Sequence, residues 1–567
     1  MKSISGILPM SIVFSSTITI VLPTMILAIA FWMRKTTPSE NLKNKWESNC
    51  LWFLSTLKVS ILLLAAWSGY TTLWADDGYR LSMSRAIVEG SKNMFSQLVW
   101  PSGSLLLNAL VMNLSPDPVM GVRFTTVALS LGTIFVVGWV TRLINGNSIA
   151  VLTAALLVSV LPMHNWLSTS FMSEIPMIFF VMLSVGLALK SWILISEASG
   201  LPYQNKHLWQ PASHRVMGWL LAILAGFSAT MAASCRYEAW MFILAFGFTI
   251  LMHYFWRQSV DFLPQGIQPK SKPVNNHFSI IFTAGTVALL FPLAWIAASW
   301  QKMGHPLAFF SDIVSETKLL SGGTIFDAGF IYLQEIFLEI GVLSSIGLVA
   351  VAVSVMLARS RPRIFFYAVL VTFYYGVTII IIGKNGTGLS IQRYIHSLIV
   401  LLFPLVGFAV GLVEEARVKM LKNPMRIIAY ATLIFCYTSL IAFAFHSIGV
   451  TSRYRWYGFQ NASFVAGYLL TQELHHPQAL PGVYSGGKIL IWTSGVDFAM
   501  LKHIPIMTGL DNQYLWDKSI AFPEKFNNDK VLTVLQAGSF INKPPADYVL
   551  IFDLMDILIY RRKDQAN

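Results

Sequence analysis

The sequence contains little charge and almost no cysteine. Of its 567 residues only 12% are Asp, Glu, Lys or Arg, whereas 55% are hydrophobic. A soluble globular domain cannot bury so large an apolar fraction, so this composition excludes an ordinary soluble enzyme and indicates an integral membrane protein. The three cysteines, Cys50, Cys235 and Cys436, lie in or beside apolar runs and lack the paired spacing of a zinc site or a disulfide framework.

Long apolar runs fill most of the chain. Twelve of them have about the 20 residues that a helix needs to cross a bilayer. They cover residues 8–33, 51–73, 122–141, 148–166, 175–195, 217–235, 238–255, 279–300, 336–357, 364–383, 395–413 and 427–447. We therefore expect a polytopic α-helical membrane protein with about 12 transmembrane helices. No internal repeat is strong enough to suggest the two related halves of a transporter.

The composition changes after the last run. Charged and turn-forming residues return, Phe464–Glu473 has a helical pattern, and Lys488–Thr493, Asp547–Phe552 and Ile557–Arg561 are rich in strand-forming residues. These patterns predict two domains, a transmembrane domain over residues 1–447 and a small α/β domain over residues 448–567.

The net charge of +13 is distributed as short Lys and Arg clusters between the apolar runs, which is typical of membrane orientation rather than of nucleic-acid binding. One set of loops and span edges carries 18 Lys and Arg, and the opposite set carries 9. The richer set is expected to be cytoplasmic. The loops around Asp76, Glu174, Arg236, His305 and Lys384, together with the C-terminal domain, then lie on the non-cytoplasmic side.

The stretch from Trp74 to Pro101 follows a predicted span without a spacer and begins with the adjacent carboxylates of Asp76 and Asp77, two residues before Tyr79. A partly desolvated carboxylate at a membrane surface can act as a general base near neutral pH. The alternative is an ordinary helix cap. The helix-compatible run before Pro101 and the apolar run Leu105–Leu114 are too short to span, so we expect external juxtamembrane helices.

Two further turns carry charge on the same predicted side. Glu174 precedes Pro176, where it acts either as a helix cap or as a second acidic group of a shared cavity. Arg236, Tyr237 and Glu238 form a very short turn between two predicted spans. There Arg236 is a candidate to bind a lipid phosphate, while an interfacial anchor or a mutual ion pair with Glu238 is the alternative.

A glycine-rich loop joins two later spans and ends at Arg393 and Tyr394. Lys384, Arg393 and the backbone NH groups of the following helix are candidates for an anion site, although a flexible connector also explains the loop. The longer loop around His305 contains enough polar groups to form a lid. Tyr79, Tyr237, Glu238, His305 and Tyr394 complete the candidate substrate-binding residues.

Together these motifs resemble the GT-C glycosyltransferases, and within them the family 39 group of protein O-mannosyltransferases and aminoarabinose transferases. Asp76-Asp77-Gly78-Tyr79 is similar to the Asp-Glu-x-Tyr signature of that group, and the resemblance extends over residues 50–450. The other matching features are Ser173–Pro176, Arg236–Trp240 and the Arg393-Tyr394 pair. Asp77 replaces the usual Glu, so the resemblance leaves either aspartate as the base. It implies a GT-C type fold.

The resemblance implies a glycosyltransferase that takes a sugar from a polyprenyl-phosphate donor. The acceptor is expected to be a hydroxyl of a glycan, lipid or protein, deprotonated by Asp76 or Asp77 on the non-cytoplasmic face of an inner or plasma membrane, with inversion. The membrane lipids are further partners. No cofactor is expected, although two carboxylates can hold Mg²⁺. The alternatives are a polytopic transporter, an O-antigen ligase or polymerase, and a non-catalytic scaffold.

Overall fold

A computed structural model describes the backbone of most of the apolar part of the chain and of five strands near the C-terminus. The described residues are 40–67, 75–90, 101–115, 118–144, 146–200, 209–261, 276–308, 333–334, 336–338, 340–358, 360–385, 391–419, 431–432, 434–440, 442–443, 488–493, 513–517, 531–537, 548–554 and 557–562. The predicted span 8–33, about half of the predicted span 427–447 and the helix expected at Phe464–Glu473 lie outside these ranges.

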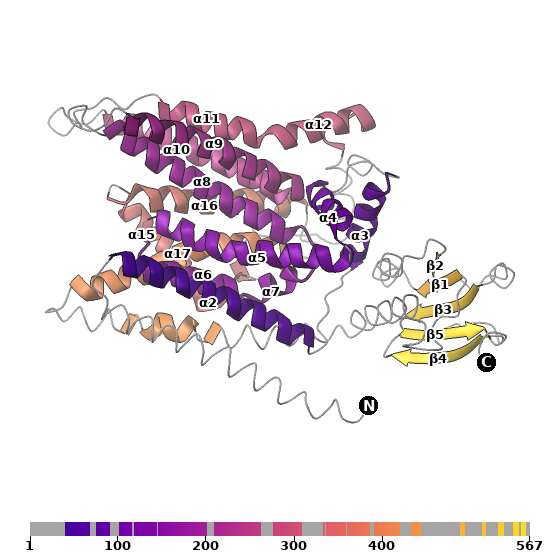
Figure 1. Cartoon of the computed structure of the whole chain (residues 1–567). Coiled ribbons are helices and arrows are strands. Elements are labelled where there is room, and N and C mark those ends of the chain that lie inside the picture. Colours follow the sequence, from indigo (N-terminus) through magenta and orange to yellow (C-terminus); the bar gives the residue numbers. More distant parts are fainter. Residues whose placement is uncertain are drawn as a thin grey trace.

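The apolar part is a bundle of helices (Figure 1). In chain order these are α2 (Glu40–Trp67), α3 (Ala75–Val88), α4 (Gly103–Leu114), α5 (Pro118–Leu143), α6 (Ser148–Val160), α7 (Pro162–Ser168), α8 (Glu174–Gly200), α9 (Trp209–Cys235), α10 (Glu238–Asp261), α11 (Asn276–Ala288), α12 (Leu290–Met303), α15 (Val342–Met356), α16 (Pro362–Asn385) and α17 (Ile391–Lys419).

Within the described ranges, six helices are long and apolar enough to cross a membrane, and the bent pair α6–α7 makes a seventh if it is counted as one span. Each of these six helices begins and ends within a few residues of an apolar run predicted from the sequence. The agreement is expected, because both the helices and the runs are defined by the length needed to cross a bilayer. The protein is therefore an integral membrane protein. The total of twelve spans stays a prediction, since part of the chain lies outside the described ranges.

The helix α17 is the centre of the bundle. Of its most apolar window, Ile395–Arg417, 89% is buried inside the protein, whereas the other candidate spans are buried over 28–61% of theirs. The main apolar core joins residues of α2, α5, α6, α8, α9, α10, α15 and α16 to α17, among them Leu157, Val181, Phe242 and Phe403. α17 is therefore surrounded mainly by other helices of the bundle.

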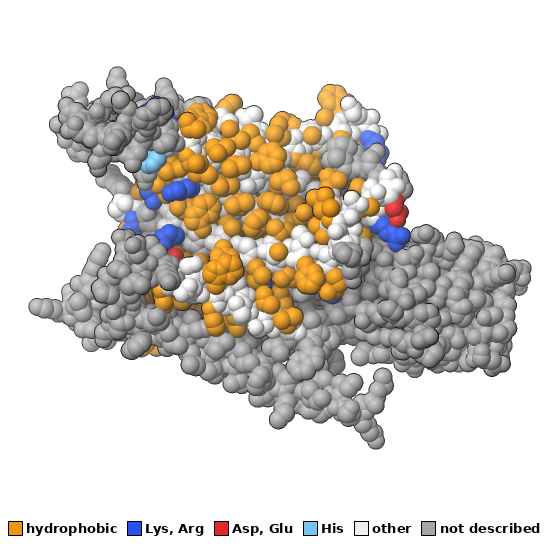
Figure 2. All heavy atoms as spheres, viewed as in Figure 1, with side chains coloured by type: hydrophobic (Ala, Val, Ile, Leu, Met, Phe, Trp, Pro, Cys, Tyr) orange, Lys and Arg blue, Asp and Glu red, His pale blue; other side chains and the backbone are white. Residues whose placement is uncertain are grey.

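Apolar side chains also cover the outside of the bundle, as expected where lipid is the solvent. Figure 2 shows a broad apolar face with Lys and Arg gathered at its two ends. Phe227 on α9, Phe282 on α11 and Leu293 on α12 are more than half exposed. In water such a patch would cause aggregation, so its extent agrees with a bilayer-embedded surface.

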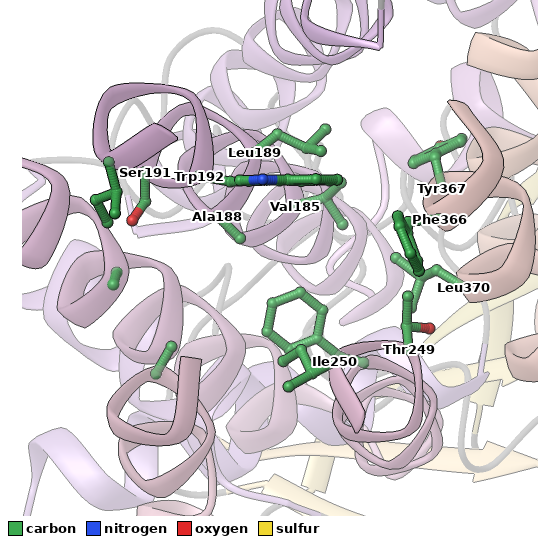
Figure 3. A pocket seen from close by; sticks show the side chains of 14 residues that line it. Val185, Ala188, Leu189, Ser191, Trp192, Thr249, Ile250, Phe366, Tyr367 and Leu370 are labelled. Carbon is green, nitrogen blue, oxygen red and sulfur yellow. The ribbon is translucent and has the colours of Figure 1, made fainter. Parts of the chain in front are cut away.

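An apolar cavity of about 90 Å³ lies between α8, α9, α10, α11 and α16 (Figure 3). Trp192, Ile250, Phe366 and Leu370 form much of its wall, and Ala188 faces it from α8. Tyr367 also lines the cavity, and its hydroxyl donates a hydrogen bond to the carbonyl of Leu401.

Five strands form a mixed sheet in the order β2-β1-β3-β5-β4, with β1 (Lys488–Thr493), β2 (Gln513–Asp517), β3 (Val531–Ala537), β4 (Tyr548–Leu554) and β5 (Ile557–Arg562). β1 pairs in parallel with β2 and β3, while β5 pairs antiparallel with β3 and β4. Figure 1 draws the sheet near the end of the bundle where α3 and α4 lie. The strands β1, β4 and β5 coincide with the three runs identified in the sequence, whereas β2 and β3 were not predicted.

Candidate functional site

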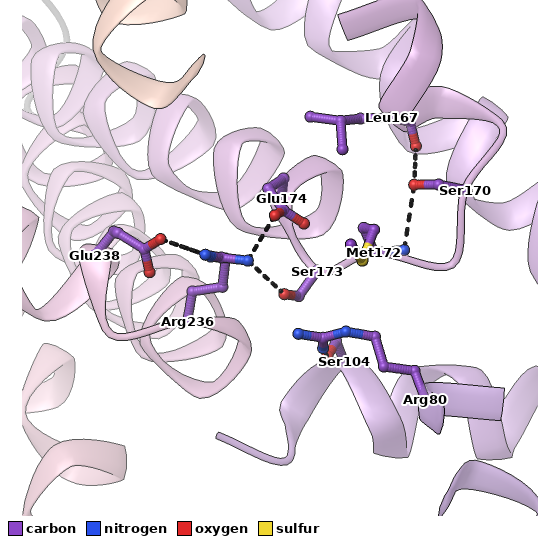
Figure 4. Close-up of polar contacts among 9 residues, drawn as sticks. All are labelled: Arg80, Ser104, Leu167, Ser170, Met172, Ser173, Glu174, Arg236 and Glu238. Carbon is purple, nitrogen blue, oxygen red and sulfur yellow. Dashed lines mark hydrogen bonds and ion pairs between the residues drawn. The ribbon is translucent and has the colours of Figure 1, made fainter. Parts of the chain in front are cut away.

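A buried cluster of three charged side chains lies where the ends of α8, α9 and α10 meet (Figure 4). Arg236 donates from Nη1 to Glu174 Oε1 at 2.6 Å, and from Nε and Nη2 to Glu238 Oε1 at 2.8 and 2.5 Å. All three residues are at most 5% exposed. An arginine held by two carboxylates in a protein interior is tightly fixed, because each N–H bond is charge-assisted.

The local sequence explains why these groups converge. α9 ends at Cys235 and α10 begins at Glu238, so the two-residue turn leaves Arg236 at the boundary of both helices. Glu174 and Glu238 each occupy the first turn of a helix, where the helix dipole favours a carboxylate. The helix dipole therefore favours the position of both acids, and the ion pairs with Arg236 account for their orientation.

The short helices α3 and α4 pack next to this cluster. Arg80 on α3 donates from Nη1 to Ser104 Oγ on α4 at 3.2 Å, in a buried contact. At the start of α4, a Cβ atom on Gly103 would come within 2.6 Å of the backbone oxygen of Ser234, two residues before Arg236. Only glycine permits that approach. The two short helices expected from the sequence are thus present as α3 and α4, packed beside Arg236, and their place on the external side stays a prediction.

Tyr237 and Trp240 belong to an aromatic group at the turn between α9 and α10. The Tyr237 hydroxyl accepts a hydrogen bond from Trp295 Nε1 at 3.0 Å, and the two rings of Tyr237 and Trp240 pack edge to face at 5.2 Å. Burial raises the pKa of the Tyr237 phenol well above its ordinary value, so the hydroxyl stays protonated and neutral. It is therefore suited to hydrogen bonding and not to proton abstraction.

His305 lies just beyond the end of α12 and is exposed. Its Nδ1 accepts from the backbone N–H of Leu307 at 3.1 Å, and its carbonyl accepts from Ser299 at 3.1 Å. These contacts shape the end of α12.

Six candidate residues are described in backbone only. Asp76, Asp77 and Tyr79 occupy the first two turns of α3, Lys384 lies in the last turn of α16, and Arg393 and Tyr394 lie in the first turn of α17. The roles assigned to their side chains stay predictions. The structure brings Glu174, Arg236 and Glu238 together, and adds Arg80 and Ser104, which the motifs did not single out.

Sequence reasoning also missed a polar cluster inside the bundle. His164 on α7 bonds through Nδ1 to His396 Nε2 on α17 at 3.0 Å and through Nε2 to Ser130 Oγ on α5 at 3.0 Å. Lys58 on α2 is fully buried and interacts electrostatically with both imidazoles. A lone Lys in a predicted span was the available signal, since charges in such segments are costly and commonly functional.

No group of three or more His, Cys, Asp or Glu side chains suited to a metal occurs among the residues whose positions are described. The Arg236 cluster is an arginine held by two carboxylates, so Nε, Nη1 and Nη2 of its guanidinium all donate to protein acids in this structure. The question of Mg²⁺ at Asp76 and Asp77 rests on side chains outside the described set.

Residues 96–306 match a family model described as dolichyl-phosphate-mannose-protein mannosyltransferase. That range includes Glu174, Arg236, Tyr237, Glu238 and His305, and begins after Asp76 and Asp77. A comparison with curated protein sequences finds no match.

Among solved structures, the fold is similar to an oligosaccharyltransferase from Archaeoglobus fulgidus tethered to an acceptor peptide, with a TM-score of 0.52 and 12% identity over 88% of this chain and 70% of that one. ArnT from Cupriavidus metallidurans bound to undecaprenyl phosphate gives a TM-score of 0.49 and 12% identity over 89% of this chain and 97% of that one. The S. cerevisiae Pmt1-Pmt2 complex with its sugar donor gives 0.34 and 16% identity over 45% and 33%. The resemblance to GT-C glycosyltransferases is confirmed by the family-model match and by the fold shared with the archaeal enzyme.

Proposed function

We propose that this protein is a membrane glycosyltransferase that moves a sugar from a polyprenyl-phosphate donor to an acceptor hydroxyl on the non-cytoplasmic face. The observation that carries the proposal is the buried Glu174–Arg236–Glu238 cluster, which lies within the residues matched by the mannosyltransferase model on a GT-C type fold. An arginine fixed beside short external helices is suited to a phosphorylated lipid.

In the proposed reaction Asp76 or Asp77 removes the proton from the acceptor hydroxyl. The oxygen attacks the anomeric carbon, and the bond from that carbon to the phosphate oxygen breaks on the opposite face. The bonding electrons leave with the polyprenyl phosphate, so the configuration of the sugar inverts. Because phosphate is already a good leaving group, a base and cations are needed more than a general acid.

The backbone of α3 supports this assignment of the base. Asp76 and Asp77 precede Arg80 by four and three positions, so helical periodicity places all three on neighbouring parts of one face. Arg80 reaches Ser104 beside the Arg236 turn. We propose that the aspartates share the face of α3 on which Arg80 lies.

Arg236, Lys384 and Arg393 are the proposed phosphate-binding cations. In the present structure Arg236 is occupied by two carboxylates, so a donor phosphate competes with Glu174, which accepts from one guanidinium nitrogen, more easily than with Glu238, which accepts from two. Tyr79, Tyr237, His305 and Tyr394 are proposed to contact the sugar or the acceptor. The sheet formed by β1–β5 is proposed to belong to an α/β domain over the outer face.

The test is sugar transfer from a radiolabelled polyprenyl-phosphate-sugar pool in membranes that contain wild type, Asp76→Asn or Asp77→Asn at equal expression. The variant that lacks the base is expected to lose about 10²- to 10⁴-fold in rate while still binding the donor. Glu89→Gln is the matched control, because Glu89 lies just past α3 and forms an exposed ion pair with Arg85. Wild-type rates in both aspartate variants contradict the proposal.

A transporter is the second candidate, because two observations favour it. The break between α6 and α7 bends the chain by 60°, and Lys58 is buried within a helix of the bundle. Broken helices and buried charges are typical of transport sites. Uptake of a labelled solute by vesicles, abolished by Lys58→Met but unaffected by Asp76→Asn and Asp77→Asn, would favour transport over transfer.

A further inference from the structure

The apolar cavity of Figure 3 extends along α8 in the half of the bundle away from the Arg236 cluster. Its lining residues on α8 run from Val185 to Ile195, ten positions and thus about 15 Å of helix. Because the candidate span on α8 is Glu174–Ser196, Val185 is its midpoint and Ile195 lies near its far end. The cluster lies at the Glu174 end. The cavity therefore faces the other leaflet of the bilayer.

The wall of this cavity is suited to hydrocarbon and not to water. Its three hydroxyl groups, those of Ser191, Thr249 and Tyr367, each donate to a backbone carbonyl and are satisfied within the protein. Apolar cavities of this kind exclude water and accept apolar ligands. Ala188 and Trp192 in the wall are partly exposed, so the cavity is not sealed. A lipid chain of the surrounding bilayer is the apolar molecule at hand.

A basic side chain lies beyond the end of the cavity, at the membrane boundary. Arg215 is the second residue of the candidate span His214–Cys235 on α9 and is exposed. It precedes Gly218 by three positions and Ala222 by seven, so the three share one face of α9. Ala222 lines the cavity, and a Cβ on Gly218 would come within 2.6 Å of Ile195. Arg215 thus lies on the face of α9 that borders the cavity.

We propose that the cavity binds one acyl chain of an anionic phospholipid, whose phosphate lies against Arg215. Anionic headgroups are attracted to basic side chains at the membrane surface, and the apolar wall accounts for the chain. Cys235, next to Arg236, is 20 residues and thus about 30 Å from Arg215 along α9. One phosphate therefore cannot contact both arginines, and this lipid is distinct from a sugar donor held at Arg236.

The test titrates the full chain, purified in detergent, with phosphatidylglycerol that carries dibrominated acyl chains. Bromine quenches indole fluorescence at close contact, and Trp192 in the cavity wall is the reporter. Wild type is expected to show a saturable loss of fluorescence, and Trp192→Phe is expected to lack that component. Wild type without saturable quenching, or a Trp192→Phe variant that retains it in full, overturns the proposal.

The charge at the headgroup is tested by Arg215→Gln, which is expected to raise the midpoint of the titration about fivefold. Lys190→Gln is the matched control and is expected to match wild type. Lys190 follows Gly186 by four positions, and the Gly186 face of α8 packs against Trp139 of α5, away from the cavity. Equal midpoints for Arg215→Gln and wild type, or equal binding of dibrominated phosphatidylcholine, overturn the assignment of an anionic lipid.

The chain itself is tested by Ala188→Leu, which occupies part of the cavity and is expected to weaken binding about tenfold. Wild-type binding in a folded Ala188→Leu variant overturns the proposal. If that variant does not fold, Trp192→Phe and Arg215→Gln decide, because neither adds volume. Unbrominated polyprenyl phosphate is expected not to restore the fluorescence, and full competition would assign the cavity to a sugar donor instead. Binding is measured without sugar transfer, so failure of the transferase proposal leaves this outcome unaffected.

Discussion

Arg236 and Glu174 are joined by a 2.6 Å contact between Nη1 and Oε1, although 61 residues separate them in the chain. Glu238 binds the other side of the guanidinium through Nε and Nη2, so the arginine is fixed in plane by acids from two helix starts (Figure 4). This pair joins the beginning of α8 to the turn between α9 and α10. These few charges therefore hold together the end of the bundle at which α8 begins and α9 ends.

The first prediction concerns the unequal roles of the three charges. Arg236→Met leaves two buried carboxylates without their cation and is expected to cost about 3–5 kcal/mol of unfolding free energy. Glu174→Gln leaves Arg236 paired with Glu238 and is expected to cost less. Arg236→Lys keeps the charge but cannot span both acids, so its loss is intermediate. Denaturant unfolding in detergent ranks the variants, and equal stability of all three contradicts the assignment.

The second prediction concerns Gly103 at the start of α4. A Cβ there would clash with both the side chain and the backbone oxygen of Ser234. Gly103→Ala is therefore expected to move α4 away from the Arg236 turn and to lower sugar transfer by at least about tenfold. Ser234→Ala removes the hydroxyl but not the backbone oxygen, so the double variant Gly103→Ala/Ser234→Ala is expected to recover only partly. Full activity in Gly103→Ala would show that α4 does not position the site.

The sequence predicted the spans well because length and hydropathy are local properties. Helices α5, α8, α9, α16 and α17 fall where apolar runs were found. The ion pair between Arg236 and Glu238 was an alternative open from sequence alone, since only one residue separates them, and the structure confirms it. The Glu174 contact was not predictable in the same way, because it depends on how α8 packs against α9.

Features that depend on tertiary packing were not predicted from the sequence. The run 148–166 has a continuous apolar character, yet Pro162 ends α6 and begins α7 at a 60° bend. Hydropathy averaged over a window cannot register a change of direction. Lys58 was not identified for the same reason, since a single charge hardly changes the mean hydropathy of an apolar run. The strands β2 and β3 lack a clear alternation and become recognisable only through their pairing with β1.

The third prediction concerns Asn147, which links two helices at their ends. Its Oδ1 accepts from the backbone N–H of Ala150 as the N-cap of α6, and its Nδ2 donates to the carbonyl of Gly411 on α17 at 2.8 Å. Asn147→Ala removes both bonds and is expected to cost about 2 kcal/mol, whereas Asn147→Ser keeps the cap and is expected to cost about half as much. Unfolding in denaturant measures both. Equal losses would show that the cap contributes nothing, and wild-type stability of Asn147→Ser would show that the bond to Gly411 contributes nothing.

The last prediction concerns the apolar cavity of Figure 3. Ala188 faces that cavity from α8, so Ala188→Leu adds an isopropyl group to the space that Trp192 and Phe366 line. Filling such a space removes a packing defect, and we expect an increase in stability of about 1 kcal/mol with unchanged sugar transfer. Ala155→Leu is the control, because Ala155 is fully buried in the close-packed core and the larger side chain is expected to destabilise the protein there.

A loss of stability in Ala188→Leu as large as in Ala155→Leu would mean that the cavity walls cannot accept the side chain. Loss of transfer with retained stability would instead show that the cavity must stay open for a lipid chain, and would connect it to the proposed reaction.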